Sequence, residues 1–327
     1  MNIFITGGAG FIGYYLARYH QQRGDRVVLI DNLFKARGKV DHALETLISA
    51  PGVSYLNADL TKPLTIETSR EAFDVVYHLA AINGTQLFYD IPYQVARDNL
   101  LMTLHLLDWL ERRAVGKLVY ASTSEVYAGC EQVGLLAIPT GEDTPVVFPQ
   151  PTHIRFSYGT SKFMGEFLCA RFGEKMKVPV SVVRYHNIYG PRMGNRHVIP
   201  EFLERIKRRE NPFRIYGGTH TRAFCYVDDA VTATALVATT PQCDGGIIHV
   251  GNSKEEISIE ALARLLLEQC GETVSVQECG GPGGSVARRC PNTTKLKQLT
   301  GFEAQTSLSQ GLSKTCEWYL GITKPSP

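Results

Sequence analysis

Short apolar runs alternate with longer segments of helical spacing along the first half of the chain. The apolar runs are rich in Val and Ile and predict strands at 2–6, 26–30, 53–56, 74–80, 117–122 and 178–185. Apolar residues recurring at helical spacing predict helices at about 11–22, 37–49, 91–113 and 157–174. Apolar strands without strict polar alternation, separated by helices, are typical of a parallel sheet covered on both faces. We therefore predict an α/β fold with a doubly wound parallel sheet of the Rossmann type.

The pattern changes after about residue 186, where loops rich in Gly, Pro and Arg become frequent. Helical spacing there predicts helices near 197–209, 227–239, 258–269 and 307–320. We predict a dinucleotide-binding domain over 1–185 and a smaller α/β substrate-binding lobe over 186–327. A later segment, about 222–250, is a candidate to return to the first domain.

Composition excludes several classes of function. The 327 residues carry 34 Lys plus Arg against 32 Asp plus Glu, a net charge of +2, so no global field attracts nucleic acid or an anionic membrane. Neither a signal peptide nor an apolar run near the ~18 residues of a membrane span is recognisable, and we expect a cytoplasmic protein. The eight cysteines include no CxxC pair, so no metal site is predicted.

A glycine-rich turn follows the first predicted strand and opens the first helix. Gly7 permits a tight turn, Gly10 lets the backbone approach a pyrophosphate, and Gly13 lets the helix pack closely on the strand. The start of the helix then faces the phosphate charge. This arrangement predicts a dinucleotide site.

Asp31, followed by Asn32, ends the second predicted strand about 24 residues after Gly7. A carboxylate in this place binds the ribose hydroxyls of NAD and repels the 2′-phosphate of NADP. The alternative is a simple turn at Asp31 and Asn32. Lys35 and Arg37 leave room for NADP, but we predict NAD.

Tyr158 and Lys162 share one face of a predicted helix because they are four residues apart. A nearby ammonium favours phenolate, so we expect Lys162 to lower the pKa of Tyr158 towards neutrality and to make it a general base. The alternative is an exposed helix on which Lys162 pairs with Glu166.

Together with these features, further motifs resemble the extended short-chain dehydrogenase/reductase family, in particular its NAD-dependent nucleotide-sugar epimerases, dehydratases and decarboxylases. The motifs are TGGAGFIG (6–13), DN (31–32), NADL (57–60), HLAA (78–81), STSEVY (122–127), YGTSK (158–162), RYHNIYGPR (184–192), TRAFCYVDD (221–229) and RRCPNTTKLKQLTGFEA (288–304). The resemblance covers almost the whole chain.

The resemblance implies roles for individual residues. Thr123, Tyr158 and Lys162 are the expected catalytic trio, with Thr123 bonded to the hydroxyl that is oxidised and with hydride leaving the sugar, usually from C4, for NAD. Asp59 is expected to bind the adenine. The implied cofactor contacts are Gly7, Gly10, Phe11, Ile12, Gly13, Asp31, Asn32, Asp59, Leu60, Leu79, Ala80, Ala81, Asn99, Tyr158 and Lys162.

The resemblance also places the nucleotide-diphosphate sugar. Asn187, Arg222 and Arg289 are expected to meet the diphosphate, and a guanidinium suits phosphate oxygens. The alternatives are a surface strand residue for Arg222 and a solvated loop residue for Arg289. Ser124 is placed with the substrate contacts, or else it shapes the turn. His186 in the RYHNIYGPR loop is expected to shape that loop, with contact to the substrate as the alternative.

Several reactions share this chemistry. Epimerisation through a 4-keto intermediate is favoured, because it needs only a base, retained NAD and room for the sugar to rotate. Family dehydratases carry Asp-Glu where this chain has Ser124-Glu125, whereas UDP-glucuronate decarboxylases carry Thr-Ser-Glu, as here, but an Arg where this chain has Phe163. Decarboxylation or dehydration with Glu125 as an acid or base stays open, as do 4-keto reduction and a non-catalytic NAD-binding sensor.

A homodimer is the remaining expectation from the resemblance, because many relatives pair through a four-helix contact. The candidate helices are those at about 91–113 and 157–174. Leu100, Leu104 and Leu107 could face a partner, or they could equally belong to the core.

Overall fold

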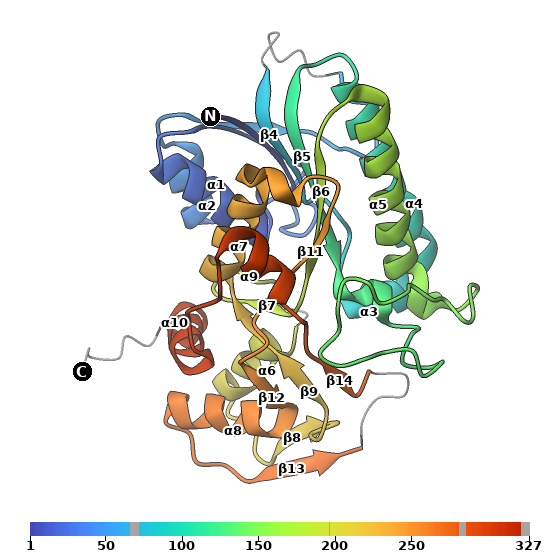
Figure 1. Ribbon diagram of the computed structural model, residues 1–327. Coiled ribbons are helices and arrows are strands. Elements are labelled where there is room, and N and C mark those ends of the chain that lie inside the picture. Colours follow the sequence, from blue (N-terminus) through green and yellow to red (C-terminus); the bar gives the residue numbers. More distant parts are fainter. Residues whose placement is uncertain (66–71, 196, 281–285, 322–327) are drawn as a thin grey trace.

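A parallel sheet of seven strands forms the centre of the structure, a computed structural model that describes residues 1–65, 72–195, 197–280 and 286–321 (Figure 1). Every neighbouring pair of strands in this sheet is parallel. In spatial order the strands are β11 (Ile247–Val250), β6 (Val180–Tyr185), β5 (Val115–Thr123), β4 (Phe73–His78), β1 (Asn2–Thr6), β2 (Arg26–Asp31) and β3 (Val53–Asn57). The predicted doubly wound sheet is confirmed.

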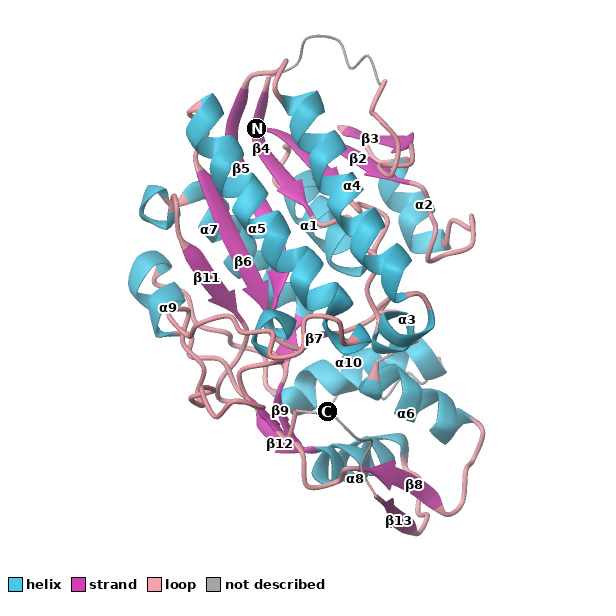
Figure 2. Cartoon of the chain, turned by 90° about the vertical axis from the view of Figure 1, so that its right-hand side faces the viewer, coloured by secondary structure: helices cyan, strands magenta, loops and turns pink. Residues whose placement is uncertain are grey.

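Helices cover both faces of the sheet, which is why its strands are apolar throughout (Figures 1 and 2). Successive side chains of a strand point to opposite faces. In β1, Ile3 and Ile5 accordingly join one core cluster with α1 (Phe11–Gln22) and α7 (Val227–Thr239). Phe4 joins the other cluster, with its ring 5.0 Å from that of Trp109 on the opposite face.

Each predicted helix is present, but two boundaries differ by three or more residues, and the helices at Thr85–Asp90 and Thr294–Thr300 were not predicted. The other helices are α2 (His42–Ile48), α3 (Thr85–Asp90), α4 (Pro92–Leu110), α5 (Ser157–Met176), α6 (Val198–Lys207), α8 (Ile259–Cys270), α9 (Thr294–Thr300) and α10 (Leu308–Leu320). The helix predicted from about 37 begins only at His42, because the Asp41 carboxylate caps it by accepting a bond from the Leu44 amide at 2.9 Å. No described helix is both long and apolar enough to cross a bilayer.

The strand order places a crevice at the middle of the sheet. From β1 the chain adds β2 and β3 on one side, then crosses over to add β4, β5 and β6 on the other. The carboxyl ends of β1 and β4 therefore meet where the winding direction reverses. Open parallel sheets bind their ligands at this point.

The C-terminal part combines α6, α8 and α10 with small sheets below the carboxyl ends of the large one (Figure 1). Its strands are β7 (Ile188–Tyr189), β8 (Phe213–Tyr216), β9 (Thr221–Ala223), β10 (Cys225–Tyr226), β12 (Glu256–Ser258), β13 (Val276–Cys279) and β14 (Arg288–Arg289). β11 leaves this part of the chain and pairs with β6 at the edge of the large sheet. The division into domains at residue 185 stays a prediction.

Candidate active site

The glycine turn after β1 has the shape of a phosphate cradle. Gly7 has φ +68°, and a Cβ there would lie 2.8 Å from the Ala80 amide nitrogen. A Cβ on Gly13 would collide with the Gly7 carbonyl oxygen. No side chain of the described residues caps α1, which begins with Phe11 and Ile12 after Gly10. The exposed amides at its start can therefore bind a pyrophosphate.

Asp31 ties this turn to the end of β2. Its carboxylate accepts bonds from the Ala9 amide at 3.2 Å and from the Leu33 amide at 2.8 Å. Burial raises the pKa of this carboxyl, against those two backbone bonds. Asn32 accepts a bond from the Phe34 amide at 3.0 Å. The carboxylate thus lies beside the glycine turn, where a ribose would be bound.

The other predicted cofactor contacts come from the segments that follow β3 and β4 and from α4. Ala80 donates its amide proton to Thr6 at 3.2 Å, which fixes the segment after β4 against β1. Asn99 accepts a bond from the Ile82 amide at 2.7 Å and donates to the Ser161 hydroxyl at 3.1 Å, so it joins this segment to α5. The remaining residues are Leu60, which is buried, and Leu79, Ala81 and Asp59, which are partly buried.

Thr123, Tyr158 and Lys162 come together at the carboxyl end of β5. Thr123 is its last residue, and a hydrogen bond joins its side chain to the Tyr158 hydroxyl. The Tyr158 ring stacks on Phe88 at 4.8 Å. Lys162, one turn along α5, lies with its ammonium 4.3 Å from the centre of the Tyr120 ring. Tyr158 and Lys162 are buried, so the alternative of an exposed helix is wrong.

The expected pKa of the phenol needs correction. Burial raises the pKa of Tyr158 above its ordinary value, and the negative charge of Glu125 raises it further, whereas hydrogen bonds with Asn83 and Thr123 lower it. Burial also lowers the pKa of Lys162 to about 8. A shift of the Tyr158 pKa towards neutrality, predicted from the spacing of Tyr158 and Lys162, is therefore wrong for the protein without ligands.

Glu125 is held between two guanidinium groups. Its carboxylate lies 2.9 Å from Arg155 and forms a second ion pair with Arg289. Burial raises the pKa of Glu125, but the two cations outweigh it and hold the value at about 2. The side chain is therefore a carboxylate at neutral pH. As long as both pairs persist, it is no proton donor.

The three residues predicted to bind a diphosphate converge on β9. Arg222 of β9 and Arg289 of β14 are register partners in a parallel pair. Asn187, with φ 44°, donates to the Ala223 carbonyl at 3.2 Å, next to Arg222. Burial and the charge of Arg289 lower the pKa of Arg222 to about 10, and its guanidinium donates to the Val286 carbonyl at 2.6 Å. The arrangement gathers positive charge beside Glu125.

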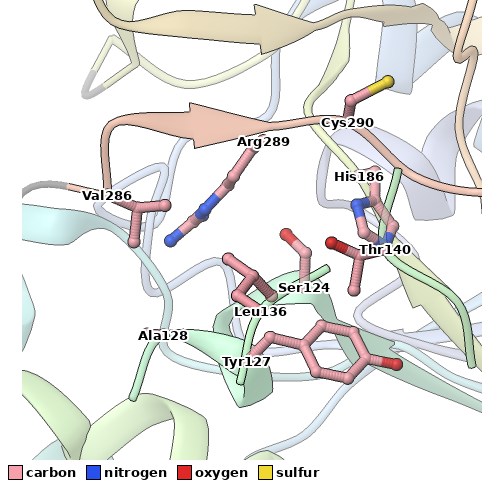
Figure 3. A pocket seen from close by; sticks show the side chains of 9 residues that line it. All are labelled: Ser124, Tyr127, Ala128, Leu136, Thr140, His186, Val286, Arg289 and Cys290. Carbon is pink, nitrogen blue, oxygen red and sulfur yellow. The ribbon is translucent and has the colours of Figure 1, made fainter. Parts of the chain in front are cut away.

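A small cavity lies between this charged group and the end of β5 (Figure 3). The Ser124 hydroxyl, the His186 ring and Arg289 reach it from three different elements. Its full lining is Ser124, Tyr127, Ala128, Leu136, Thr140, His186, Val286, Arg289 and Cys290. Ser124, which lines the cavity, directly follows the predicted catalytic Thr123 in the chain.

A buried network of polar side chains lies next to the end of β5. The sequence did not predict it. Arg184 forms two bonds with the Glu166 carboxylate, at 2.8 and 2.6 Å. Ser122 donates to the same carboxylate, and Arg184 also donates to the Tyr127 hydroxyl. Glu166 therefore forms its ion pair with Arg184. The pair between Glu166 and Lys162, which the sequence offered as the alternative, is wrong. An Arg inside the apolar run 178–185 was the one available signal.

Three neighbours of the predicted catalytic residues were also missed. Arg155 holds Glu125, Asn83 bonds Tyr158, and Phe88 stacks on the Tyr158 ring. All three come from 82–95 or 128–156, where the sequence shows no periodicity that would bring a side chain to the site. Phe88 lies on α3, a helix that the sequence did not predict, and the positions of all three side chains depend on the tertiary path of these segments.

Comparisons with known proteins identify the family of the chain. The model of the NAD dependent epimerase/dehydratase family matches residues 3–251. Among curated proteins, UDP-N-acetyl-alpha-D-glucosaminuronate decarboxylase of Bacillus cytotoxicus is 35% identical over 328 residues, with 97% of each chain covered. UDP-glucuronate 4-epimerase of Thermodesulfobacterium geofontis is 30% identical over 319 residues, covering 96% of this chain and 94% of its own.

A solved structure with a similar fold contains NAD. UDP-glucuronic acid 4-epimerase from Bacillus cereus, in complex with UDP-glucuronic acid and NAD, superposes with a TM-score of 0.85 at 26% identity over 98% of this chain and 99% of that one. The predicted NAD cofactor and family resemblance are confirmed, whereas the roles of the individual site residues stay predictions. The chain belongs to the NAD dependent epimerase/dehydratase family.

Proposed function

We propose that the chain is an NAD-dependent decarboxylase of a nucleotide-diphosphate uronic acid. The observation that carries this proposal is the Glu125 carboxylate between Arg155 and Arg289, two residues beyond Thr123. Return of a hydride to C4 needs no such charged group. A substrate that carries a carboxylate close to the reacting carbon would be bound by Arg155 and Arg289, which Glu125 holds in position.

The chain's own residues supply proton transfer at C4. Tyr158 accepts the proton of the C4 hydroxyl while Thr123 bonds the same oxygen, and the bond from Asn83 stabilises the phenolate. Lys162, one turn along α5, is buried, and burial lowers its pKa to about 8, so in this proposal it is the cation on the same face of α5 as the phenolate. Bound NAD supplies the hydride acceptor and returns the hydride at the end. The cradle at Gly7 and Gly13, the free start of α1 and Asp31 fit that cofactor.

Loss of CO₂ follows from the ketone at C4. The bond between C5 and the carboxyl carbon breaks, and its electron pair moves to the C4 oxygen to give an enolate. A proton from solvent then adds to C5 and gives a 4-keto pentose. Return of the hydride to C4, with the proton held by Tyr158 passing back to the oxygen, gives the nucleotide pentose. In this proposal Arg155 and Arg289, oriented by Glu125, bind and position the substrate carboxylate, and Arg222 binds the diphosphate. Arg289 thereby takes a different role from the diphosphate contact that the sequence predicted.

Two relatives with different reactions support the uronate as the substrate class. The Bacillus cytotoxicus protein is named as a decarboxylase of a UDP-uronate, and the Thermodesulfobacterium geofontis protein as a 4-epimerase of another. The shared acid group of these substrates suits the guanidinium groups of Arg155, Arg222 and Arg289.

Epimerisation at C4 is the second candidate, and it was favoured from the sequence alone. The set of Thr123, Tyr158 and Lys162 suffices for it, because the hydride only has to return on the other face of the ketone. Dehydration is less well supported, since Ser124 stands where an acid would precede Glu125.

Products from a substrate panel test the proposal. The NAD-loaded protein is incubated with UDP-glucuronate, UDP-N-acetylglucosaminuronate and the matching UDP-hexoses, and products are followed by mass spectrometry and NMR. We expect release of CO₂ from a uronate with no net consumption of cofactor. A product of unchanged mass and inverted C4 would establish the epimerase instead. Stoichiometric cofactor use would identify a ketoreductase, and no conversion of any substrate would support the sensor.

We also propose a homodimer through α4 and α5, which lie side by side on the outside of the sheet (Figure 2). Large apolar side chains on these helices are exposed, among them Phe167 at 57%, Met164 at 46% and Leu104 at 40%. Leu107, in contrast, is buried in the core. Exposed apolar groups clustered in this way are typical of a protein interface. The cytoplasmic location, like this dimer, stays a prediction.

Phe167→Glu is expected to give a monomer, because two added carboxylates would face each other across a two-fold contact. Light scattering after gel filtration measures the mass, and circular dichroism checks the fold. Trp318→Glu is the matched control, since Trp318 is 47% exposed on α10, away from this surface. A monomeric wild-type protein at micromolar concentration would contradict the proposal.

A further inference from the structure

His186 is a buried histidine whose hydrogen-bonding groups are unused. It lies between β6 and β7, and only 2% of its surface is exposed. Neither ring nitrogen has a hydrogen-bond partner among the described residues. A buried polar group without a partner is destabilising, so such groups call for an explanation.

The polar groups next to His186 bond to one another, except that Nδ1 of His249 also has no hydrogen-bond partner among the described residues. Arg184 is bound by Glu166 and Tyr127, and the Tyr127 hydroxyl lies 2.8 Å from Nε2 of His249. Burial, together with the charges of His249, Arg289 and Arg184, holds the pKa of His186 well below its ordinary value. The ring is therefore neutral at pH 7, with one nitrogen as a donor and the other as an acceptor.

The backbone and the packing hold the ring in place. The His186 amide donates to the Val250 carbonyl at 2.9 Å, which extends the pairing of β6 with β11. The ring lies 4.5 Å from that of His249. Gly251 leaves space for it, because a Cβ at that position would lie 3.0 Å from Cβ of His186. The imidazole is thus presented by a rigid part of the fold.

The ring borders the cavity beside the catalytic trio (Figure 3). Figure 3 shows the hydroxyls of Ser124 and Thr140 near the His186 ring. The Thr140 hydroxyl donates to the Ala137 carbonyl at 2.9 Å, so its lone pairs remain able to accept a bond. The opposite wall is apolar, with Leu136 and Val286. The cavity therefore offers one donor and several acceptors beside an apolar surface.

We propose that His186, with Thr140, recognises an uncharged polar substituent on the sugar ring, either a hydroxyl or an acetamido group. This inference rests on the proposed nucleotide-uronate substrate and specifies which part of it the pocket reads. The charged parts of that substrate have Arg155, Arg222 and Arg289 as partners. A hydroxyl or an amide both donates and accepts, as the neutral imidazole does, and the wall of Leu136 and Val286 suits an acetamido methyl.

Binding measurements on the NAD-loaded full chain test this inference. The ligands are UDP, UDP-glucuronate, UDP-N-acetylglucosaminuronate and UDP-sugars deoxygenated at C2 or C3, titrated into wild type, His186→Phe and His186→Asn. We expect His186→Phe to bind UDP like wild type and to bind the preferred sugar nucleotide about 10-fold to 100-fold more weakly, because a buried group of the sugar loses its partner. Weakened binding of one deoxy sugar or of one uronate by wild type identifies the group that is read.

The melting temperature separates recognition from a structural role. In the absence of sugar nucleotide, His186→Phe is expected to melt no lower than wild type, since an apolar ring replaces unsatisfied nitrogens. Unchanged affinity of this variant for every sugar nucleotide would overturn the inference, and so would a lower melting temperature with lost UDP binding. If wild type binds the sugar nucleotides through His186 but releases no CO₂, the proposed reaction fails and the recognition role stands.

Discussion

Tyr158→Phe is expected to lower turnover by about 10²–10⁴-fold, the contribution typical of a positioned acid or base. The variant loses the hydroxyl that bonds Thr123 and Asn83 but keeps the ring that stacks on Phe88 at 4.8 Å. NAD and UDP affinity and the melting temperature are therefore expected to stay near the wild-type values. Steady-state kinetics on the substrate found in the panel, together with calorimetric titration of NAD and UDP, measure both effects.

Tyr93→Phe is the control for this change, because Tyr93 is 75% exposed on α4. It should leave turnover unchanged. Activity of Tyr158→Phe within a few fold of wild type would remove the phenol as the base. Loss of NAD binding together with activity would instead give Tyr158 a role in the cofactor site.

Glu125→Gln is expected to lower CO₂ release by about 10²-fold or more while oxidation at C4 continues. A neutral amide cannot hold Arg155 and Arg289 as Glu125 does, and preorganised charges of this kind are worth about 10²–10³-fold in turnover. Thr123, Tyr158 and Lys162 are unchanged, so reduced cofactor should accumulate on the enzyme. Rapid-mixing absorbance of the reduced nicotinamide and trapped CO₂ separate the two steps.

Glu125→Gln is also expected to change how the free energy of unfolding depends on pH. The pKa of Glu125 is held at about 2 against an ordinary 4.5, which corresponds to about 3 kcal/mol of unfolding free energy. This stabilisation is fully present above pH 4.5 and is lost as the pH falls through the folded value near 2. The stability difference between wild type and Glu125→Gln should therefore be constant above pH 4.5 and shrink below it.

Glu204→Gln controls for the change of side chain, since Glu204 pairs with Arg208 on an exposed helix face. An exposed pair contributes little, so its stability should match wild type at every pH. Unchanged CO₂ release from Glu125→Gln would leave Glu125 structural. Epimerised product from both wild type and variant would favour the second candidate function.

The sequence was sufficient wherever a local pattern reflects burial or backbone geometry. Apolar runs such as NIFIT and RVVLI can only be buried on both faces, so they predicted the parallel sheet, and GGAGFIG predicted the cradle because only glycine fits at Gly7 and Gly13. The late start of α2 was missed because the Asp41 cap outweighed a helical pattern that seemed to begin earlier. The motifs also placed Thr123, Tyr158 and Lys162 among the candidates, and the fold brings them together.

Only the tertiary structure decided the electrostatics of the site. The sequence could not show that burial raises the pKa of Tyr158, that Arg155 and Arg289 hold Glu125 ionised, or that Glu166 pairs with Arg184. Nor could it show that His186 lies buried with unused nitrogens. Local patterns record which residues are apolar and how the backbone turns. Charge interactions and desolvation depend instead on which side chains from distant parts of the chain share one buried space, and folding alone brings these together.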